Sequence, residues 1–265
     1  MMKRYSETQE PKTSSLPEET SPVLSVLLQL LGGDRQTANL ISQLSVSFEL
    51  LEFQLGDVII NLSNPPDNTV RDEQKAQYFY LVCQGKVRLL SSEPEKQREV
   101  STQSLIEGET FGADTLFSQT ILPYWAKAAT SVRVARISIE TLQPWLEKLP
   151  KLKEHCLTTT YQRQTLIFFK TLTELKSLPS YRLENLLPYL VEKQVAAGER
   201  LSQVTPESAG RFWLHCGQLQ SQTLTLGSSW GYPNPTPKEA VAQTALWVYQ
   251  LPSEYWETAV RSRLY

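Results

Sequence analysis

Cysteine, histidine and net charge are all scarce in this sequence, and each scarcity argues against a class of protein. The 265 residues include three cysteines and two histidines. An odd number of cysteines without C-x-x-C spacing argues against a disulfide framework and a zinc site, so we predict reduced thiols and no bound metal. The formal net charge of -2 provides no basic field for nucleic acid, which is therefore not an expected partner.

Long hydrophobic runs are absent as well. No stretch reaches the roughly 20 apolar residues that would span a bilayer. Residues 1–21 are polar, carry no segment like a signal peptide, and are predicted to be a disordered N-terminal tail. These features predict a cytoplasmic protein without direct membrane insertion.

Catalytic signatures are also missing. Neither Gly112 nor Gly231 lies in a G-x-x-x-x-G-K motif, and no Ser-His-Asp order or pair of carboxylates stands out. His155 falls in a helical segment and His215 in the core pattern of a strand, so both are interpreted as structural or surface residues. We predict that the protein is not an enzyme and has no catalytic residues.

The hydrophobic pattern that is present changes from helical to alternating and back. Helical spacing covers residues 22–31, 34–45 and 139–172, and strand patterns cover 53–60, 77–83, 86–90 and 132–137. Short strands flanked by helices predict a mainly β fold, a small barrel or roll closed by helices.

A corner rich in glycine follows the third strand pattern. Gly112 permits a close backbone approach that a Cβ would block, and Phe111 can anchor beneath it. Such a corner exposes backbone N–H groups that can hold an anion. The candidate ligand-binding residues are Phe111, Gly112, Ala113, Asp114, Thr115 and Lys127. The alternative for Lys127 is a solvated position on a strand.

The second half of the sequence repeats the first in shortened form. Residues 195–201 match 53–59, and residues 212–217 match 79–84 with the glycine displaced by one. The missing residues fall in loops, which tolerate changes of length. We predict a first domain at 22–150, a helical linker at 151–174 and a shortened, degenerate second domain at 175–265.

The order of these signals resembles the cyclic nucleotide-binding domain. The resemblance is carried by the Gly56-Asp57 turn, the strand around Tyr80, the segment 108–112 and the closing strand 132–137. It implies two tandem jelly-roll barrels of the cyclic nucleotide-binding-like type, each flanked by helices. In that family a glutamate holds the ribose hydroxyl and an arginine pairs with the cyclic phosphate. Ala113 replaces the glutamate here, and Lys127 lines up with the arginine.

These losses lead to an expectation of no cofactor and of a regulatory or scaffold protein that acts through protein contacts. The alternative is a small-ligand sensor that binds a cyclic nucleotide or another phosphate ligand in the first domain. Because Lys127 lacks the two-pronged geometry of arginine, tight binding of cAMP or cGMP is not expected.

A second, more local resemblance concerns the C-terminal half. Residues 229–233, 242–244 and 251–256 look like parts of the N-terminal cytoplasmic region of cyanobacterial-type ABC exporters that contain a peptidase. This resemblance implies a protein partner such as a membrane transporter, and a location peripheral to a membrane complex. The predicted partner surface consists of Trp230, Tyr232 and Trp256. Packing of the barrel mouths is the alternative role of these aromatic residues.

Overall fold

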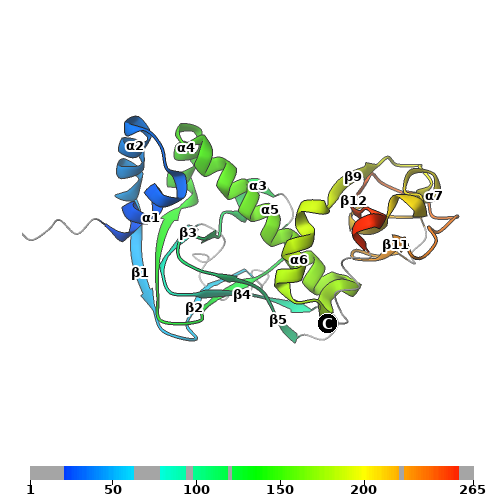
Figure 1. Ribbon diagram of the computed structural model, residues 1–265, viewed down its shortest axis with the longest axis horizontal. Helices are drawn as coiled ribbons and strands as arrows, with labels where there is room; N and C mark the ends of the chain where they lie inside the picture. The colour runs from blue at the N-terminus through cyan, green and yellow to red at the C-terminus, as the bar shows by residue number, and fades with distance from the viewer. Residues whose placement is uncertain (1–20, 63–77, 94–97, 119–120, 221–223, 257–265) are drawn as a thin grey trace, which may run out of the picture.

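The computed structural model of the chain describes residues 21–62, 78–93, 98–118, 121–220 and 224–256 (Figure 1). The predicted N-terminal tail lies outside these ranges except for Ser21. Within them, no helix is both long enough and apolar enough to cross a membrane. The same ranges contain no group of three or more His, Cys, Asp or Glu residues that could hold a metal ion.

The N-terminal part combines helices with two antiparallel sheets. Its helices are α1 (Pro22–Leu31), α2 (Arg35–Ser45), α3 (Asp114–Phe117) and α4 (Ile139–Lys148). Its strands are β1 (Glu49–Phe53), β2 (Val58–Asn61), β3 (Tyr78–Gln84), β4 (Val87–Glu93), β5 (Arg98–Leu105), β6 (Thr110–Phe111), β7 (Trp125–Ala128) and β8 (Val132–Ser138). The sheet orders are β1-β8-β3-β6 and β2-β7-β4-β5. Two facing antiparallel sheets with flanking helices agree with the predicted jelly-roll class.

Two hydrophobic cores hold this part together. One lies between the two sheets and includes Tyr80 and Val134 from one sheet and Leu89 and Ala126 from the other. The second core lies on the outer face of β3 and β8, where α1, α2 and α4 cover side chains such as Phe79. Because successive strand residues point to opposite faces, β3 contributes to both cores.

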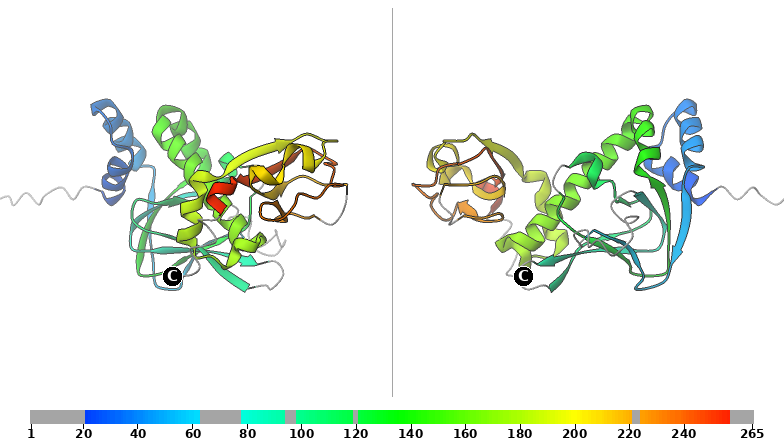
Figure 2. Two further views of the ribbon diagram at one scale, coloured as in Figure 1. Left: turned by 45° about the vertical axis from the view of Figure 1, so that its right-hand side comes forward. Right: turned by 180° about the vertical axis from the view of Figure 1, so that it is seen from behind.

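Helix α5 (Pro150–Leu172) runs from the first pair of sheets to the C-terminal part, as Figures 1 and 2 show. The sequence pattern predicts continuous helix over 139–172, but the structure divides it at Leu149, because Pro150 starts a new helix well and cannot continue the old one. Every residue from Thr165 to Thr171 is buried. A helix segment that is buried on all sides must be covered from more than one direction. The end of α5 is covered by the N-terminal sheets on one side and by the C-terminal part on the other.

The C-terminal part is built on a third antiparallel sheet. Its helices are η2 (Glu174–Ser177), α6 (Ser180–Leu186), η3 (Leu187–Tyr189), α7 (Leu201–Val204) and η4 (Glu207–Ala209). Its strands are β9 (Val191–Val195), β10 (Arg211–Cys216), β11 (Ser229–Gly231) and β12 (Leu246–Leu251), in the order β11-β10-β12-β9. One face of this sheet packs on the end of α5 through Trp213 and Tyr249.

Several contacts of the N-terminal part recur in the C-terminal part. Gly56 N–H donates to the Ala128 carbonyl at 2.9 Å, and Gly198 N–H donates to the Ala242 carbonyl at 2.8 Å. The residue after each glycine is acidic, and its side chain accepts from the backbone N–H three residues earlier. The turns that follow β1 and β9 are therefore closed in the same way.

A second recurrence changes the sequence match by one residue. A Cβ on Gly112 would meet the ring of Tyr80 at 2.9 Å, and a Cβ on Gly231 would meet the ring of Phe212 at 2.9 Å. Tyr80 therefore corresponds to Phe212, and the match of Phe212 to Phe79 is wrong by one position. With this correction Gly85, which follows β3, matches Gly217, which follows β10, without displacement.

Candidate functional site

The predicted corner consists of β6, Gly112 and α3, and its backbone is tightly packed. Phe111 stacks on Tyr80 with ring centroids 4.8 Å apart and planes 7° apart. Gly112 has φ 89, and a Cβ at this position would lie 2.4 Å from the Tyr78 carbonyl oxygen. The expectation that Gly112 allows a close approach, with Phe111 as the anchor, is confirmed.

Asp114, the first residue of α3, forms a buried ion pair with Arg163 of α5. The Arg163 Nη1 atom lies 2.9 Å from both carboxylate oxygens, and the two side chains are 2% and 1% exposed. Gln164 donates to the same carboxylate from Nε2 at 3.0 Å. Arg163 also donates from Nη2 to the Thr110 carbonyl. The corner is thus fastened to α5 by charge-assisted hydrogen bonds.

Tyr124 completes this cluster from the segment just before β7. Its hydroxyl donates to Asp114 Oδ2 at 2.7 Å and accepts from Gly112 N–H at 3.1 Å. The N–H that the sequence assigns to an anion is therefore bonded to a side chain of the same chain. We call Asp114, Tyr124, Arg163 and Gln164 the corner clamp.

Burial and charge set the protonation states in the corner clamp. Burial by itself raises the pKa of Asp114, but the positive charge of Arg163 and the hydrogen bonds from Tyr124, Gln164 and Arg163 lower it overall. Burial, followed by the charge of Asp114, raises the pKa of Tyr124 well above its ordinary value. The carboxylate is therefore charged at neutral pH, and the phenol is neutral and donates to it.

The other predicted ligand residues are divided between the corner and the opposite face of a sheet. Ala113 is buried beside Gly112, and Thr115 is exposed on α3. Lys127 does not join them, because Tyr124, Ala126 and Ala128 point into the core between the sheets and strand alternation turns Lys127 outward. Its Nζ pairs with Glu99 at 3.4 Å. The interpretation of Lys127 as a solvated strand charge fits this position.

The predicted partner surface is largely buried. Trp230 is 2% exposed and donates from Nε1 to the Thr205 hydroxyl at 2.9 Å. Trp256 is 9% exposed and lies against the guanidinium of Arg211, 5.4 Å from the ring centroid. Tyr232 is half-buried. Side chains that fill a core present little surface to a partner, so the packing role of Trp230 and Trp256 replaces the predicted surface.

Sequence reasoning missed Tyr124 as a corner residue and Arg163 altogether. Arg163 lies on the same side of α5 as Cys156, Thr160 and Ile167, which are buried and follow helical spacing. A charged residue in a buried stripe requires a partner, and this was the available signal. The alternation that points Ala126 and Ala128 inward also points Tyr124 inward.

The two histidines predict a pH dependence of stability. Burial, with the nearby charge of Arg163, lowers the pKa of His155, and burial lowers the pKa of His215. As the pH falls below about 6.5 the unfolded chain binds these protons before the folded chain does, so stability falls. The free energy of unfolding, measured with urea, should be lower at about pH 5.5 than at about pH 7.5. These two pH values span the range in which the histidines titrate.

The double variant His155→Gln/His215→Gln supplies the control, because the chain has no other histidine. Its free energy of unfolding should be nearly the same at both pH values. Burial raises the pKa of Glu184 and Glu192. The folded chain therefore binds protons at these carboxyl groups more readily than the unfolded chain, which increases stability as the pH falls further and opposes the effect of the histidines. An equal fall in the double variant would show that the histidines are not the cause.

Comparison with known proteins gives a family match within the N-terminal part. Residues 64–148 match the cyclic nucleotide-binding domain family, a class of regulatory rather than catalytic domains. Comparison with curated protein sequences gives no match.

Among solved structures the chain is similar to the N-terminal domain of a transcriptional regulator from Streptomyces coelicolor A3(2), at 22% identity over 54% of this chain and 91% of that chain, with a TM-score of 0.37. It is similar to the catabolite activator protein of Thermus thermophilus, at 20% identity over 52% and 57% of the two chains, with a TM-score of 0.40. It is also similar to the regulatory domain of Toxoplasma gondii PKA with cAMP, at 12% identity over 91% and 92%, with a TM-score of 0.38.

Proposed function

We propose that the protein is a regulatory sensor in which the first domain, residues 22–150, binds a small phosphate-bearing ligand such as a cyclic nucleotide. The corner clamp is the observation that carries this proposal. It joins the corner of the family-matched region to α5 through two side chains that are almost fully buried, Asp114 and Arg163. A ligand that moves the corner would therefore move α5.

Helix α5 extends this connection to the C-terminal part. Its residue Thr165 lies within hydrogen-bond distance of the Tyr249 hydroxyl of β12, 3.3 Å away. The ring of Phe169 meets that of Trp213 of β10 edge-on, with centroids 5.1 Å apart. Packed aromatic rings do not deform smoothly, so a shift of α5 would be transmitted to the third sheet.

We also propose that the C-terminal part, residues 175–265, is a second domain of the same ancestry and receives this signal through the linker 151–174. The recurring contacts of Gly56 and Gly198, and of Gly112 and Gly231, support a common origin. A turn and a corner closed by the same atoms in both halves are more specific than a shared strand pattern.

A phosphate at the corner would have to compete with groups already there. It would replace the Tyr124 hydroxyl at Gly112 N–H, and it would attract the Arg163 guanidinium away from Asp114. Arginine can form two parallel hydrogen bonds to a phosphate as it does to a carboxylate. Exchange of the partner of Arg163 is thus the proposed switch.

Isothermal titration with cAMP, cGMP and cyclic di-GMP tests this proposal. Tyr124→Phe keeps the ring and removes the competing hydroxyl, so it should strengthen binding by roughly two- to tenfold. Lys127→Gln is the control, because Lys127 faces away from the corner and should not affect binding. If neither the wild-type chain nor Tyr124→Phe binds any of these ligands, the sensor proposal is wrong.

Regulation through protein contacts alone is the second candidate function, with a transporter complex as the partner that the ABC exporter resemblance suggests. Exposed apolar side chains around the edge strand β1 favour it: Val46 is 84% exposed, Leu55 73% and Leu50 41%. Absence of ligand binding in the titration, together with loss of partner binding in Leu55→Glu, would favour this candidate over the sensor.

A further inference from the structure

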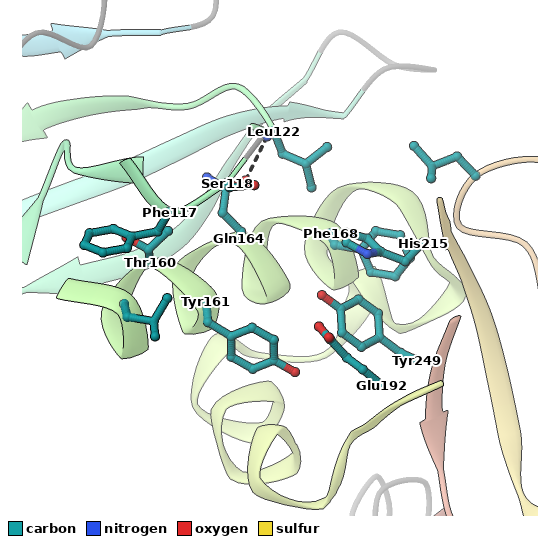
Figure 3. Close-up of a pocket in the computed structure, with 12 residues that line it drawn as sticks. Phe117, Ser118, Leu122, Thr160, Tyr161, Gln164, Phe168, Glu192, His215 and Tyr249 are labelled. Atoms are coloured by element: carbon teal, nitrogen blue, oxygen red, sulfur yellow. Dashed lines mark hydrogen bonds between the residues drawn. The ribbon is translucent and has the colours of Figure 1, made fainter. Parts of the chain in front are cut away.

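A cavity of about 290 Å³ lies where α3, α5 and the third sheet meet. This volume is close to the lower end of the range for small-molecule pockets. The side chains that line the cavity come from both parts of the chain (Figure 3). Phe117 belongs to α3, and Thr160, Tyr161 and Phe168 belong to α5. Glu192, His215 and Tyr249 belong to β9, β10 and β12, respectively.

Polar groups without partners line this cavity. Thr160 is 3% exposed, and among the described residues its hydroxyl has no hydrogen-bond partner. His215 makes ring contacts with Phe168 and Tyr249, and its ring nitrogens form no hydrogen bond within the described part of the chain. Buried polar groups are normally satisfied, but the Thr160 oxygen has almost no accessible surface, so His215 is the unpaired polar group that can reach a ligand in the cavity.

The charge of the cavity selects against anions. Its lining contains no lysine or arginine, and the carboxylate of Glu192 stands at its exposed side. In the described residues Glu192 forms no ion pair. Figure 3 shows this carboxylate and the hydroxyls of Tyr161 and Tyr249 facing the same space. A ligand with hydrogen-bond donors suits this lining, whereas a phosphate would be repelled.

The aromatic rings of the lining favour a flat molecule. His215 lies edge-on to Phe168 at 5.3 Å and tilted toward Tyr249 at 4.8 Å between ring centroids. Burial lowers the pKa of His215, which leaves a neutral ring that can both donate and accept. Phe168 and Tyr249 are 0% and 2% exposed and support the His215 ring from beneath, so the rings that can contact a planar ligand are those of His215 and Tyr161.

We propose that this cavity is a binding site for an uncharged or cationic planar nitrogen heterocycle with an amino group, of the size of a nucleobase or nucleoside. The Glu192 carboxylate accepts from the amino group, and the His215 imidazole pairs with a ring nitrogen. The site is separate from the corner and does not require the sensor function proposed above.

The cavity is connected to the corner clamp by Gln164. Its Oε1 accepts from Leu122 N–H at 2.8 Å (Figure 3), and its Nε2 donates to Asp114 at 3.0 Å. Gln164 is itself one of the lining residues. A molecule in the cavity therefore contacts a side chain that holds the corner, and its binding would stabilise the junction of α5 with the third sheet.

Titration of the full chain with adenosine tests the site, with AMP as the matched probe that adds a phosphate. Adenosine should bind and raise the melting temperature, and AMP should bind at least tenfold more weakly because of Glu192. Glu192→Gln should weaken adenosine binding about tenfold or more. His215→Phe keeps an aromatic ring but removes the hydrogen-bonding nitrogens, so it should also weaken adenosine binding.

Leu226→Trp should block the cavity and abolish adenosine binding, whereas Leu55→Trp is the same change at an exposed position outside it. The proposal is overturned if adenosine fails to bind the wild-type chain at about 1 mM. It is also overturned if Leu226→Trp binds adenosine as well as Leu55→Trp does. Binding of cyclic nucleotides at the corner is scored separately, by Tyr124→Phe, so the two proposals can fail independently.

Discussion

Arg163→Met is expected to lower the free energy of unfolding by about 3–5 kcal/mol. The substitution leaves Asp114 charged and 1% exposed, with its carboxylate cut off from the guanidinium that lies 2.9 Å away. Water cannot easily replace Arg163 at this depth, so most of the desolvation penalty of the carboxylate becomes uncompensated. Methionine fills much of the volume of the arginine stem, which limits the contribution of an empty cavity.

Urea unfolding of two further variants separates charge from packing in this result. Arg133→Met removes an ion pair with the same 2.9 Å separation, but its partners are 47% and 64% exposed, so the loss should be about 0–1 kcal/mol. Asp114→Asn with Arg163→Met should recover part of the loss, because no buried carboxylate remains unpaired. Equal losses in Arg163→Met and Arg133→Met would contradict the buried clamp.

Gly112→Ala is expected to destabilise the chain by about 2–5 kcal/mol, the sum of a backbone term and a steric term. Gly112 has φ 89, which costs alanine about 1–2 kcal/mol in itself. The new Cβ would also lie 2.4 Å from the Tyr78 carbonyl oxygen, a separation that the neighbouring backbone must widen. That displacement adds a steric cost of about 1–3 kcal/mol.

Gly56→Ala isolates the steric term, because Gly56 has φ 93 and a Cβ there would have no atom within 4 Å. Chemical denaturation of the two variants should show a clearly larger loss for Gly112→Ala. If the two losses are equal, the corner is not closely packed. The result also bears on ligand tests: Gly112→Val would disturb folding itself, so Tyr124→Phe is the cleaner probe of binding.

The features that the sequence predicts well are those set by neighbouring residues. Helix α1 matches the predicted range 22–31, because its apolar residues repeat every turn and glycines follow it. The corner at Gly112 was predictable because the need for glycine arises from a close backbone approach. The combination of short strands with flanking helices was predictable from the same local patterns.

The features that the sequence predicts poorly depend on long-range contacts. Arg163 and Asp114 are 49 residues apart, and no local pattern brings them together. Lys127 was assigned to the corner from motif order, although strand alternation turns it to the outer face. Trp230 suits a core as well as a surface, and only its contacts with Phe212 and Thr205 decide between them.

Hydrogen exchange of the full chain with and without cAMP tests the central claim most directly, that a ligand at the corner is sensed by the C-terminal part through α5. The account predicts that cAMP changes exchange at the corner, in the buried half of α5 and in strands β10 and β12. A change confined to the N-terminal sheets, or no change at saturating cAMP, would contradict it.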